Sequence, residues 1–216
     1  MRAAHFILTR YALQMDGRPL PSIKWLAHRR RLFEAYTLPS VARQTVRNFV
    51  WLVFVDHRMT SVLDACEEWR KVCPQLVPVV TTEGWDNFNA TMREAIRAHL
   101  PSDATHVITT RLDNDDAIAP DFVALVQAEC RGEPETRFVN FEVGENLDTQ
   151  SGRRNPHPHP CNMFVSAIEP AATFQGVLTW AHNTIEQIGH VYRITAPGRW
   201  THLVHPYNEW PQGRTE

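Results

Sequence analysis

Several features that would point directly to a class of function are absent from the 216-residue sequence. No apolar run approaches the ~20 residues of a membrane-spanning helix, and the first residues hold no hydrophobic stretch of signal-peptide length. The formal net charge is -2, so no overall charge attracts nucleic acid. The sequence therefore predicts a cytoplasmic protein with no transmembrane segment and no nucleic-acid partner.

Cysteine and glycine are also scarce where specific sites would need them. The four cysteines are scattered without C-x-x-C spacing, which favours reduced thiols over a disulfide framework. Residues 8–11 (L-T-R-Y) contain no glycine, and none occurs before Gly17. A nucleotidyltransferase usually has a glycine-rich, basic phosphate loop near its first strand, so this absence counts against that class.

The residues that are present form an alternating pattern over the first 130 positions. We expect strands at 5–9, 50–56, 76–81 and 105–110, and helices at 22–36, 39–44, 60–72, 89–100 and 120–130. In the first helix, Ile23, Leu26, Arg30 and Phe33 are expected near one face. Alternating strands and helices predict an α/β fold with a mostly parallel central sheet and flanking helices.

The pattern becomes irregular after residue 131. Strands are expected at 137–143 and 162–168 and near Tyr192 and Leu203, with a helix at 181–188. Residues 144–160 are rich in Gly, Asn, Pro and His and predict a loop. This half favours a mixed, more antiparallel arrangement. Since no linker separates it from the first half, we expect one domain over residues 1–216.

Three carboxylates, Asp113, Asp115 and Asp116, follow directly after an apolar strand, with Asn114 between the first two. In an extended chain Asp113 and Asp115 point to the same side. Crowded carboxylates repel one another unless a cation joins them, and oxygen ligands suit Mg²⁺ or Mn²⁺. Ligands bind beyond the carboxyl ends of strands in open α/β sheets. The cluster predicts a metal site, with a solvated acidic turn as the alternative.

A calcium-binding EF-hand loop is excluded because Ile118 stands where its glycine is needed.

Two segments resemble inverting glycosyltransferases of the GT-A fold. Residues 38–56 are similar to their S-x-x-x-Q-T-x-x-x-F-E-hydrophobic-D signature, and residues 107–122 hold a D-x-D-D cluster before a Pro-Asp-Phe helix start. The sequence looks most like the group called "putative rhamnosyltransferases" in residues 8–10, 32–33, 38–40 and 110–116, and in His205 with Asn208. The resemblance is good over residues 5–130 and looser to about residue 208.

The resemblance implies a GT-A-like, Rossmann-like fold in which residues 1–130 bind a nucleotide sugar and residues 131–216 face the acceptor. The implied reaction is metal-dependent, inverting transfer of a sugar, with rhamnose as a candidate, from a nucleoside-diphosphate sugar to an acceptor hydroxyl. The acceptor is a glycan, a lipid-linked molecule or a protein. Two alternatives stay open: a non-catalytic nucleotide- or carbohydrate-binding module, and a nucleotidyltransferase.

The resemblance also implies roles for single residues. The expected ligands of Mn²⁺ or Mg²⁺ are Asp113, Asp115 and His205. The expected donor-binding residues are Arg10, Asp56, Arg111, Asn114 and Asp116. Among these, Asp56 should contact the nucleoside and Arg10 the base or diphosphate, while Asn114 and Asp116 should flank the sugar or support the metal site.

The catalytic base is the point at which the sequence departs from the larger family. That family often carries a Glu-Asp pair before a late helix, whereas residues 179–183 here read T-W-A-H-N, without an aspartate. His182 is a candidate because imidazole titrates near the working pH. Glu169 and Glu142 are the competing carboxylates.

For other polar and aromatic groups, both a structural and a functional interpretation are open. The 157–161 stretch, H-P-H-P-C, favours a rigid surface loop or acceptor-side lid over a zinc site. The basic stretch 28–31 with Lys24 favours a solvated face, with peripheral contact to anionic lipid as the alternative. His202 and His205 should point to opposite faces of a strand. The tryptophans that are candidates to line a binding surface, with core packing as the alternative, are Trp85, Trp180, Trp200 and Trp210.

Overall fold

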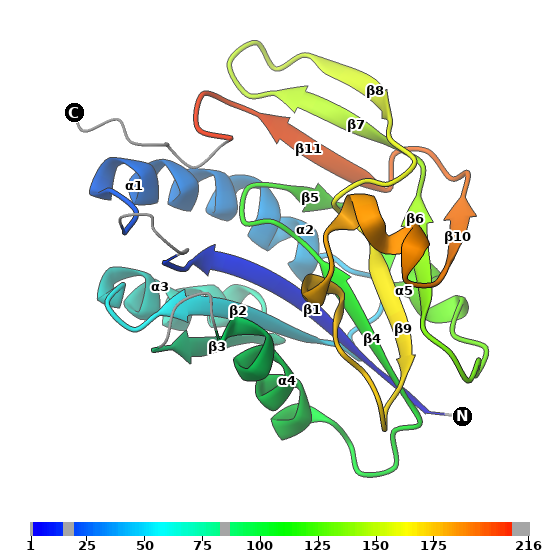
Figure 1. Ribbon diagram of the computed structural model, residues 1–216. Coiled ribbons are helices and arrows are strands. Elements are labelled where there is room, and N and C mark those ends of the chain that lie inside the picture. Colours follow the sequence, from blue (N-terminus) through cyan, green and yellow to red (C-terminus); the bar gives the residue numbers. More distant parts are fainter. Residues whose placement is uncertain (1, 15–19, 83–86, 209–216) are drawn as a thin grey trace.

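Figure 1 shows the computed structural model, which describes residues 2–14, 20–82 and 87–208. The first half alternates strands and helices as predicted. Its elements are β1 (Ala3–Ala12), α1 (Ile23–Leu32), α2 (Leu38–Ala42), β2 (Val50–Asp56), α3 (Thr60–Val72), β3 (Leu76–Thr81), α4 (Phe88–His99) and β4 (His106–Arg111). The α5 helix (Phe122–Ala128) follows. The predicted α/β class with a mostly parallel sheet is confirmed.

The larger sheet has, within the described residues, the strand order β10-β6-β9-β4-β1-β2-β3. Its later strands are β6 (Arg137–Phe141), β9 (Ser166–Pro170) and β10 (His190–Ile194). The β1 strand lies between β2 and β4 and runs parallel to both. Within the described part of this larger sheet, only β9 runs antiparallel to its neighbours, β4 and β6. The carboxyl ends of β1, β2 and β4 therefore meet at one edge of the sheet.

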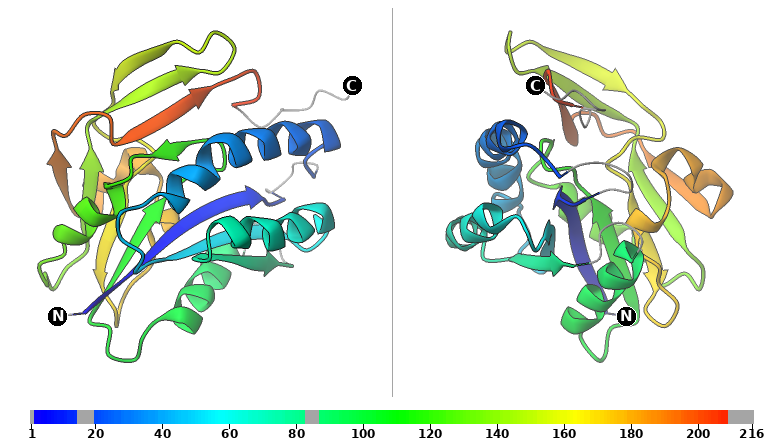
Figure 2. Two further views of the ribbon diagram at one scale, coloured as in Figure 1. Left: turned by 180° about the vertical axis from the view of Figure 1, so that it is seen from behind. Right: turned by 60° about the vertical axis from the view of Figure 1, so that its left-hand side comes forward.

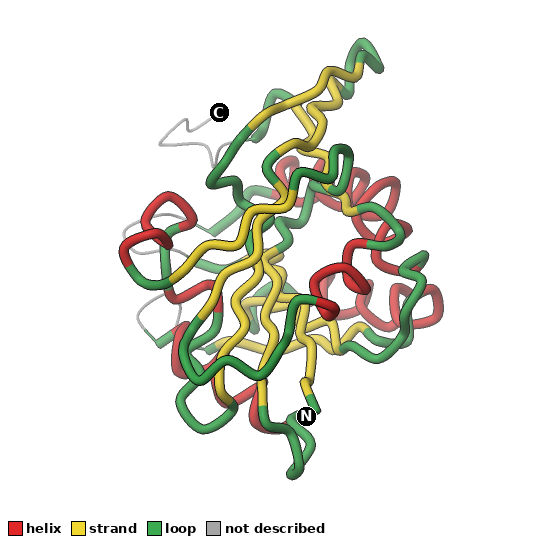
Figure 3. Tube along the Cα trace, turned by 90° about the vertical axis from the view of Figure 1, so that its right-hand side faces the viewer, coloured by secondary structure: helices red, strands yellow, loops and turns green. Residues whose placement is uncertain are grey.

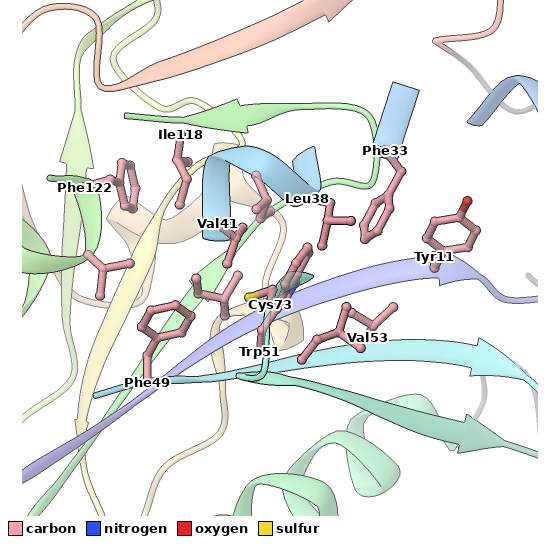
Figure 4. Close-up of a cluster of buried hydrophobic side chains, with 14 of the residues drawn as sticks. Tyr11, Phe33, Leu38, Val41, Phe49, Trp51, Val53, Cys73, Ile118 and Phe122 are labelled. Carbon is pink, nitrogen blue, oxygen red and sulfur yellow. The ribbon is translucent and has the colours of Figure 1, made fainter. Parts of the chain in front are cut away.

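Alternation of apolar side chains buries both faces of this sheet. In β2, Trp51, Val53 and Val55 face one cluster, while Leu52 and Phe54 face another. The first cluster also holds side chains of α2, α3 and α5, and Figure 4 shows part of it around Trp51. The second cluster holds side chains of α4 and of the turns after β9. The strands form a central layer between helices in Figure 3, so the fully apolar run of β2 is explained by burial on both sides.

A smaller sheet, ordered β5-β11-β7-β8, packs across the carboxyl-end side of the first (Figure 2). Its strands are β5 (Ala117–Ile118), β7 (Val143–Asp148), β8 (Arg154–Pro158) and β11 (Trp200–Val204). The loop predicted at 144–160 is wrong, because β7 and β8 form an antiparallel hairpin there. The prolines of β8 argue against a strand in the sequence, but they are tolerated here because β8 lies at the edge of its sheet. Gly144 is needed in β7, since a Cβ atom there would collide with the Trp200 ring.

The first helical segment differs from the prediction in its buried face. The buried side chains of α1 are Trp25, Arg29 and Leu32, whereas Ile23 is 87% exposed. The helix does not stop before Pro39, because a π-helical turn at Phe33–Thr37 joins α1 to α2 and places the proline in the first turn of α2. The predicted helix at 181–188 is instead a 3₁₀ helix, His182–Gln187.

Two of the four candidate tryptophans pack in or against the core. Trp200 is fully buried, stacks on Phe164 with ring centroids 4.8 Å apart, and donates to the carbonyl of Phe141. Trp180 packs edge-on against Phe138. Trp200 is therefore a core residue, and Trp180 is half-buried against the second cluster. Trp85 and Trp210 lie outside the described residues.

Candidate active site at the carboxyl ends of β1, β2 and β4

The polar residues predicted for the site gather at one edge of the large sheet. Arg10 lies near the end of β1, Asp56 ends β2, and Arg111 ends β4. The acid turn, defined here as residues 113–116, follows β4 directly. In Figure 1 the end of β11 and the α1 helix lie above this edge. Such an edge of an open α/β sheet is where ligands bind.

The acid turn is a turn and not an extended strand. The backbone N–H of Asp116 donates to the carbonyl of Asp113 at 3.3 Å, which reverses the chain direction. The alternation that would place Asp113 and Asp115 on the same side therefore does not apply, and the two carboxylates have different partners. That expectation is corrected.

Asp113 is the most open carboxylate of the turn, with 31% of its side chain exposed. Arg111 donates to Oδ2 at 3.0 Å, and Arg10 lies 3.9 Å from Oδ1. Burial alone would raise the pKa of this carboxyl, but the two arginines outweigh it and lower the pKa to about 2. Asp113 is therefore an anion held between two guanidinium groups.

Asn114 and Asp115 point inward, towards α1. Asn114 donates to the carbonyl of Tyr11 at 2.7 Å and accepts from Arg29 at 3.1 Å. The buried carboxylate of Asp115 forms an ion pair with Arg29 and lies 2.9 Å from Nε2 of His205. The structure thus brings together two of the three predicted metal ligands, Asp115 and His205, while Asp113 turns to other partners.

The hydrogen bonds of His205 fix its tautomer. The backbone N–H of Tyr207 donates to Nδ1 at 3.1 Å, so Nε2 carries the proton that Asp115 accepts. To hold a cation, Nε2 would have to give up this proton to Nδ1, and the ring would then lose the hydrogen bond that Nδ1 accepts from Tyr207. These donor types fit a divalent ion of the Mn²⁺ or Mg²⁺ kind, which often takes only one or two carboxylates and completes its shell with water and phosphate oxygens. Among the described residues, no group of three or more His, Cys, Asp or Glu side chains is placed to hold a metal.

Asp116 connects the acid turn to β11. Its carboxylate accepts from the backbone N–H of Leu203 at 3.0 Å and lies 3.2 Å from Nδ1 of His202. Burial and the neighbouring Asp115 raise its pKa to about 7. The hydrogen bond to Asp116 raises the pKa of His202 above its usual value. With 2% exposure, Asp116 is buried between the acid turn and β11.

His202 and His205 both reach the acid turn, which corrects the expectation of opposite faces. The strand β11 ends at Val204, so His205 lies beyond the strand and strand alternation does not set its direction. The two imidazoles reach different aspartates, His202 contacting Asp116 and His205 contacting Asp115.

Asp56 is fully buried at the end of β2 and is held by Arg58. The Arg58 side chain donates to both carboxylate oxygens, at 2.8 and 2.6 Å, and the Arg58 backbone N–H donates at 3.0 Å. These hydrogen bonds lower the pKa of Asp56. Arg58 also donates to Gln14 at 2.6 Å. A nucleoside could reach Asp56 only after Arg58 moves, since Arg58 covers both oxygens.

The three candidate bases, His182, Glu169 and Glu142, have different surroundings. His182 is half-buried, and the pKa of its imidazole is lowered by burial and by the charge of Arg111, with Asp113 opposing. It therefore lies within electrostatic reach of the acid turn. Glu169 lies inside β9, where its carboxylate accepts the backbone N–H groups of Gln175 and Gly176 at 2.8 and 2.9 Å. Both oxygens of Glu169 thus have backbone donors in this structure, and its role as base stays a prediction. Glu142 lies 3.8 Å from Arg193, outside the acid turn.

Arg29 is the site residue that the sequence analysis missed, because the basic stretch was read as a solvated face. Its side chain lies 4.8 Å above the Trp25 ring and donates to the carbonyls of Tyr207 and Asn208 at 2.7 and 3.0 Å. The signal was present: Arg29 is spaced four residues from Trp25 and three from Leu32, which is the spacing of a buried helical face. The predicted solvated face holds for Arg30, which is exposed and pairs with Glu34 at 2.7 Å.

The family described as "Putative rhamnosyl transferase" matches residues 17–215. This chain belongs to that family. The match includes the acid turn, Asp56, His182 and His205, whereas Arg10 lies before the matched region. The predicted family, and with it the glycosyltransferase class, is confirmed.

The solved structures of TarS confirm the GT-A-like fold. Residues 1–349 of Staphylococcus aureus TarS give a TM-score of 0.53 at 13% identity, covering 93% of this chain and 60% of that one. A longer TarS chain gives 0.52 at 12%, covering 95% and 37%. Mycobacterium tuberculosis H37Rv Rv0371c, crystallised with manganese, gives 0.44 at 12%, covering 97% and 95%. This chain thus spans about three fifths or less of the TarS chains. A comparison with curated proteins found no match.

Two further sequence expectations concern thiols and membranes. All four cysteines are unpaired, and three of them, Cys66, Cys73 and Cys130, are buried. Across residues 2–14, 20–82 and 87–208, every helix is too short or too polar to cross a bilayer.

Proposed function

We propose that this chain transfers a sugar from a nucleoside-diphosphate sugar to an acceptor hydroxyl, and that rhamnose is the first sugar to test. The observation that carries the proposal is the convergence of Arg10, Asp56, Arg111 and the acid turn at the carboxyl edge of a GT-A-like sheet. The description of the family supports the sugar, and the fold supports the position of the donor.

The donor would lie along this edge, with its nucleoside at β2 and its diphosphate at β1 and β4. Asp56 would accept a hydrogen bond from the nucleoside once Arg58 releases it. Arg10 and Arg111 flank Asp113, so their positive charges are placed to stabilise the negative charge that develops on the leaving diphosphate. Asn114 and Asp116 would act indirectly, since both are buried and hold the turn to β1 and β11.

Asp115 and His205 would hold a divalent ion, with Asp113 joining through water. When bound, Mn²⁺ or Mg²⁺ supplies Lewis-acid stabilisation of the leaving diphosphate. Carboxylate oxygen and imidazole nitrogen are ligand atoms that these ions accept. Asp115 is kept in place by Arg29, and the imidazole of His205 is kept in place by the backbone of Tyr207.

His182 would remove the proton of the acceptor hydroxyl, and direct attack on the anomeric carbon would invert its configuration. The lowered pKa of His182 keeps the imidazole neutral at pH 7, as a base must be. His159 lies beside it, with ring centroids 6.2 Å apart. The 154–158 strand and the residues after it therefore approach the acceptor side of the site.

The proposal is tested by release of nucleoside diphosphate from a panel of nucleotide sugars that includes dTDP-, UDP- and GDP-linked hexoses. We expect slow hydrolysis of one donor without acceptor, dependent on Mn²⁺ or Mg²⁺ and abolished by EDTA. Binding of a nucleotide sugar without any turnover would instead identify a non-catalytic binding module. No binding and no turnover with any donor would contradict the proposal.

A further inference from the structure

Arg29 is the most connected charged side chain at the acid turn. It is 5% exposed, forms an ion pair with Asp115, and donates to Asn114 at 3.1 Å. Its other nitrogen donates to the carbonyls of Tyr207 and Asn208. One guanidinium thus joins α1, the acid turn and the segment that follows β11.

The Arg29 guanidinium is paired with the Asp115 carboxylate, which is the group that would bind a metal ion. The Asp115 carboxylate faces the positive charge of Arg29, and a divalent ion arriving alone would be repelled by that charge in a buried setting. Arg10 and Arg111 add two more positive charges beside Asp113. The carboxylates of Asp113 and Asp115 are therefore already paired with arginines before any cation binds.

A diphosphate changes this balance. Its negative charges would compensate the arginines and supply additional oxygen ligands, so an ion that arrives with the diphosphate meets an attractive site. This step rests on the proposed function, whereas the repulsion of a lone ion rests on the position of Arg29 alone.

We propose that Arg29 is a positioning residue that acts as the resident cation of the acid turn. It orients Asp115 beside His205 and prevents a divalent ion from binding there unless a diphosphate accompanies the ion. Lysine would keep the charge, but a single ammonium group cannot match the forked geometry with which Arg29 reaches Asp115, Asn114 and two carbonyls.

The test is Mn²⁺ binding followed by electron paramagnetic resonance of the free ion. For the unmodified protein we expect no binding of Mn²⁺ alone at micromolar concentration and clear binding when dTDP, UDP or GDP is added. Arg29→Met should bind Mn²⁺ alone roughly a hundredfold more tightly, because one nearby positive charge is gone. A merely structural role would lower thermal stability without raising affinity for the lone ion.

Arg30→Met is the matched control, since Arg30 is the next residue of the same helix and is exposed. It should bind Mn²⁺ as the unmodified protein does. If Arg29→Met does not fold, Arg29→Lys keeps the test: the retained charge should still exclude lone Mn²⁺. Tight binding of Mn²⁺ alone by the unmodified protein or by Arg29→Lys would overturn the role of Arg29.

The outcome separates this inference from the proposed function. If Arg29→Met gains Mn²⁺ affinity but no nucleotide binds to any variant, the proposed donor is wrong, while the exclusion of the lone ion by Arg29 stands. If a nucleotide binds and the unmodified protein also binds lone Mn²⁺ tightly, the donor stands and the role of Arg29 is wrong.

Discussion

Two of the buried aspartates at the sheet edge, Asp56 and Asp115, are each held by an arginine, but the arginines come from different places. Arg58 lies two residues after Asp56, and 39% of its side chain is exposed. Arg29 comes from α1, far away in the sequence, and is 6% exposed by the same measure. A local, exposed partner can move aside for a ligand, whereas a distant, buried partner holds separate elements together.

We infer from this difference that the two ends of the edge have different roles in the reaction. The Asp56 end is suited to exchange its arginine for a nucleoside. The Asp115 end is suited to stay fixed while the reaction proceeds. Substitutions at the two ends should therefore affect different kinetic constants.

Asp115→Asn should have the largest effect, lowering kcat by at least about 10³-fold, because it removes the charge that would hold the metal at the reacting end. The measurement is donor turnover with saturating nucleotide sugar and Mn²⁺. Asp116→Asn is the control, since it replaces a carboxyl whose pKa is already raised to about 7 and which contacts β11. Equal losses in both variants would contradict the assignment of the metal to Asp115.

His182→Gln should lower kcat by about 10²–10³-fold, within the usual contribution of a general base. Its folded pKa is lowered below the ordinary 6.5. Because a base must be unprotonated, activity should persist down to pH 6.5 and fall only below it, and the variant should lose this acidic limb. Glu142→Gln, at an ion pair with Arg193, serves as the control. An unchanged pH profile in His182→Gln would exclude it as the base.

Asp56→Asn should raise the donor KM by about ten- to a hundredfold while kcat changes little, since nucleoside contacts are made equally in the ground and transition states. The measurement is steady-state kinetics over a range of donor concentrations. A loss confined to kcat would show that the two ends of the edge do not differ as described.

His5 offers the smallest test, a buried polar group of β1 with no ionic partner. Burial lowers its pKa to about 3. The unfolded chain therefore binds a proton below pH 6.5 that the folded chain does not, and stability falls as the pH falls. Between pH 7 and 5 this group should cost about 2 kcal/mol, at about 1.4 kcal/mol per pH unit. Urea unfolding of His5→Gln should lack this part of the loss, and identical acid sensitivity would refute it.

The sequence predicted the elements whose signal is local. The apolar run of β2 and the amphipathic pattern of α4 each predicted the right element, because the residues that form the pattern all lie within that element. The hairpin of β7 and β8 was missed, since exposed prolines carry no strand pattern and the pairing of β7 with β11 comes from distant residues.

The site shows the same limit. The acid turn and Asp56 could be predicted because they follow strands whose ends converge. The buried position of Arg29, the binding of Glu169 by backbone N–H groups, and the contact of Asp115 with His205 each depend on packing between distant segments. Spacing along the helix could have placed Arg29 on the buried face with Trp25 and Leu32, but it does not identify Asp115 as the partner.

The most direct test of the central claim is thermal unfolding with dTDP, UDP, GDP and CMP, each with and without Mn²⁺. One nucleotide at 100 times its dissociation constant should stabilise the fold by about 2.7 kcal/mol. The account predicts that this shift is largest with Mn²⁺, weaker in Asp56→Asn, and stripped of its metal dependence in Asp115→Asn. Absence of a shift with every nucleotide would contradict the account and leave the acid turn as a structural feature.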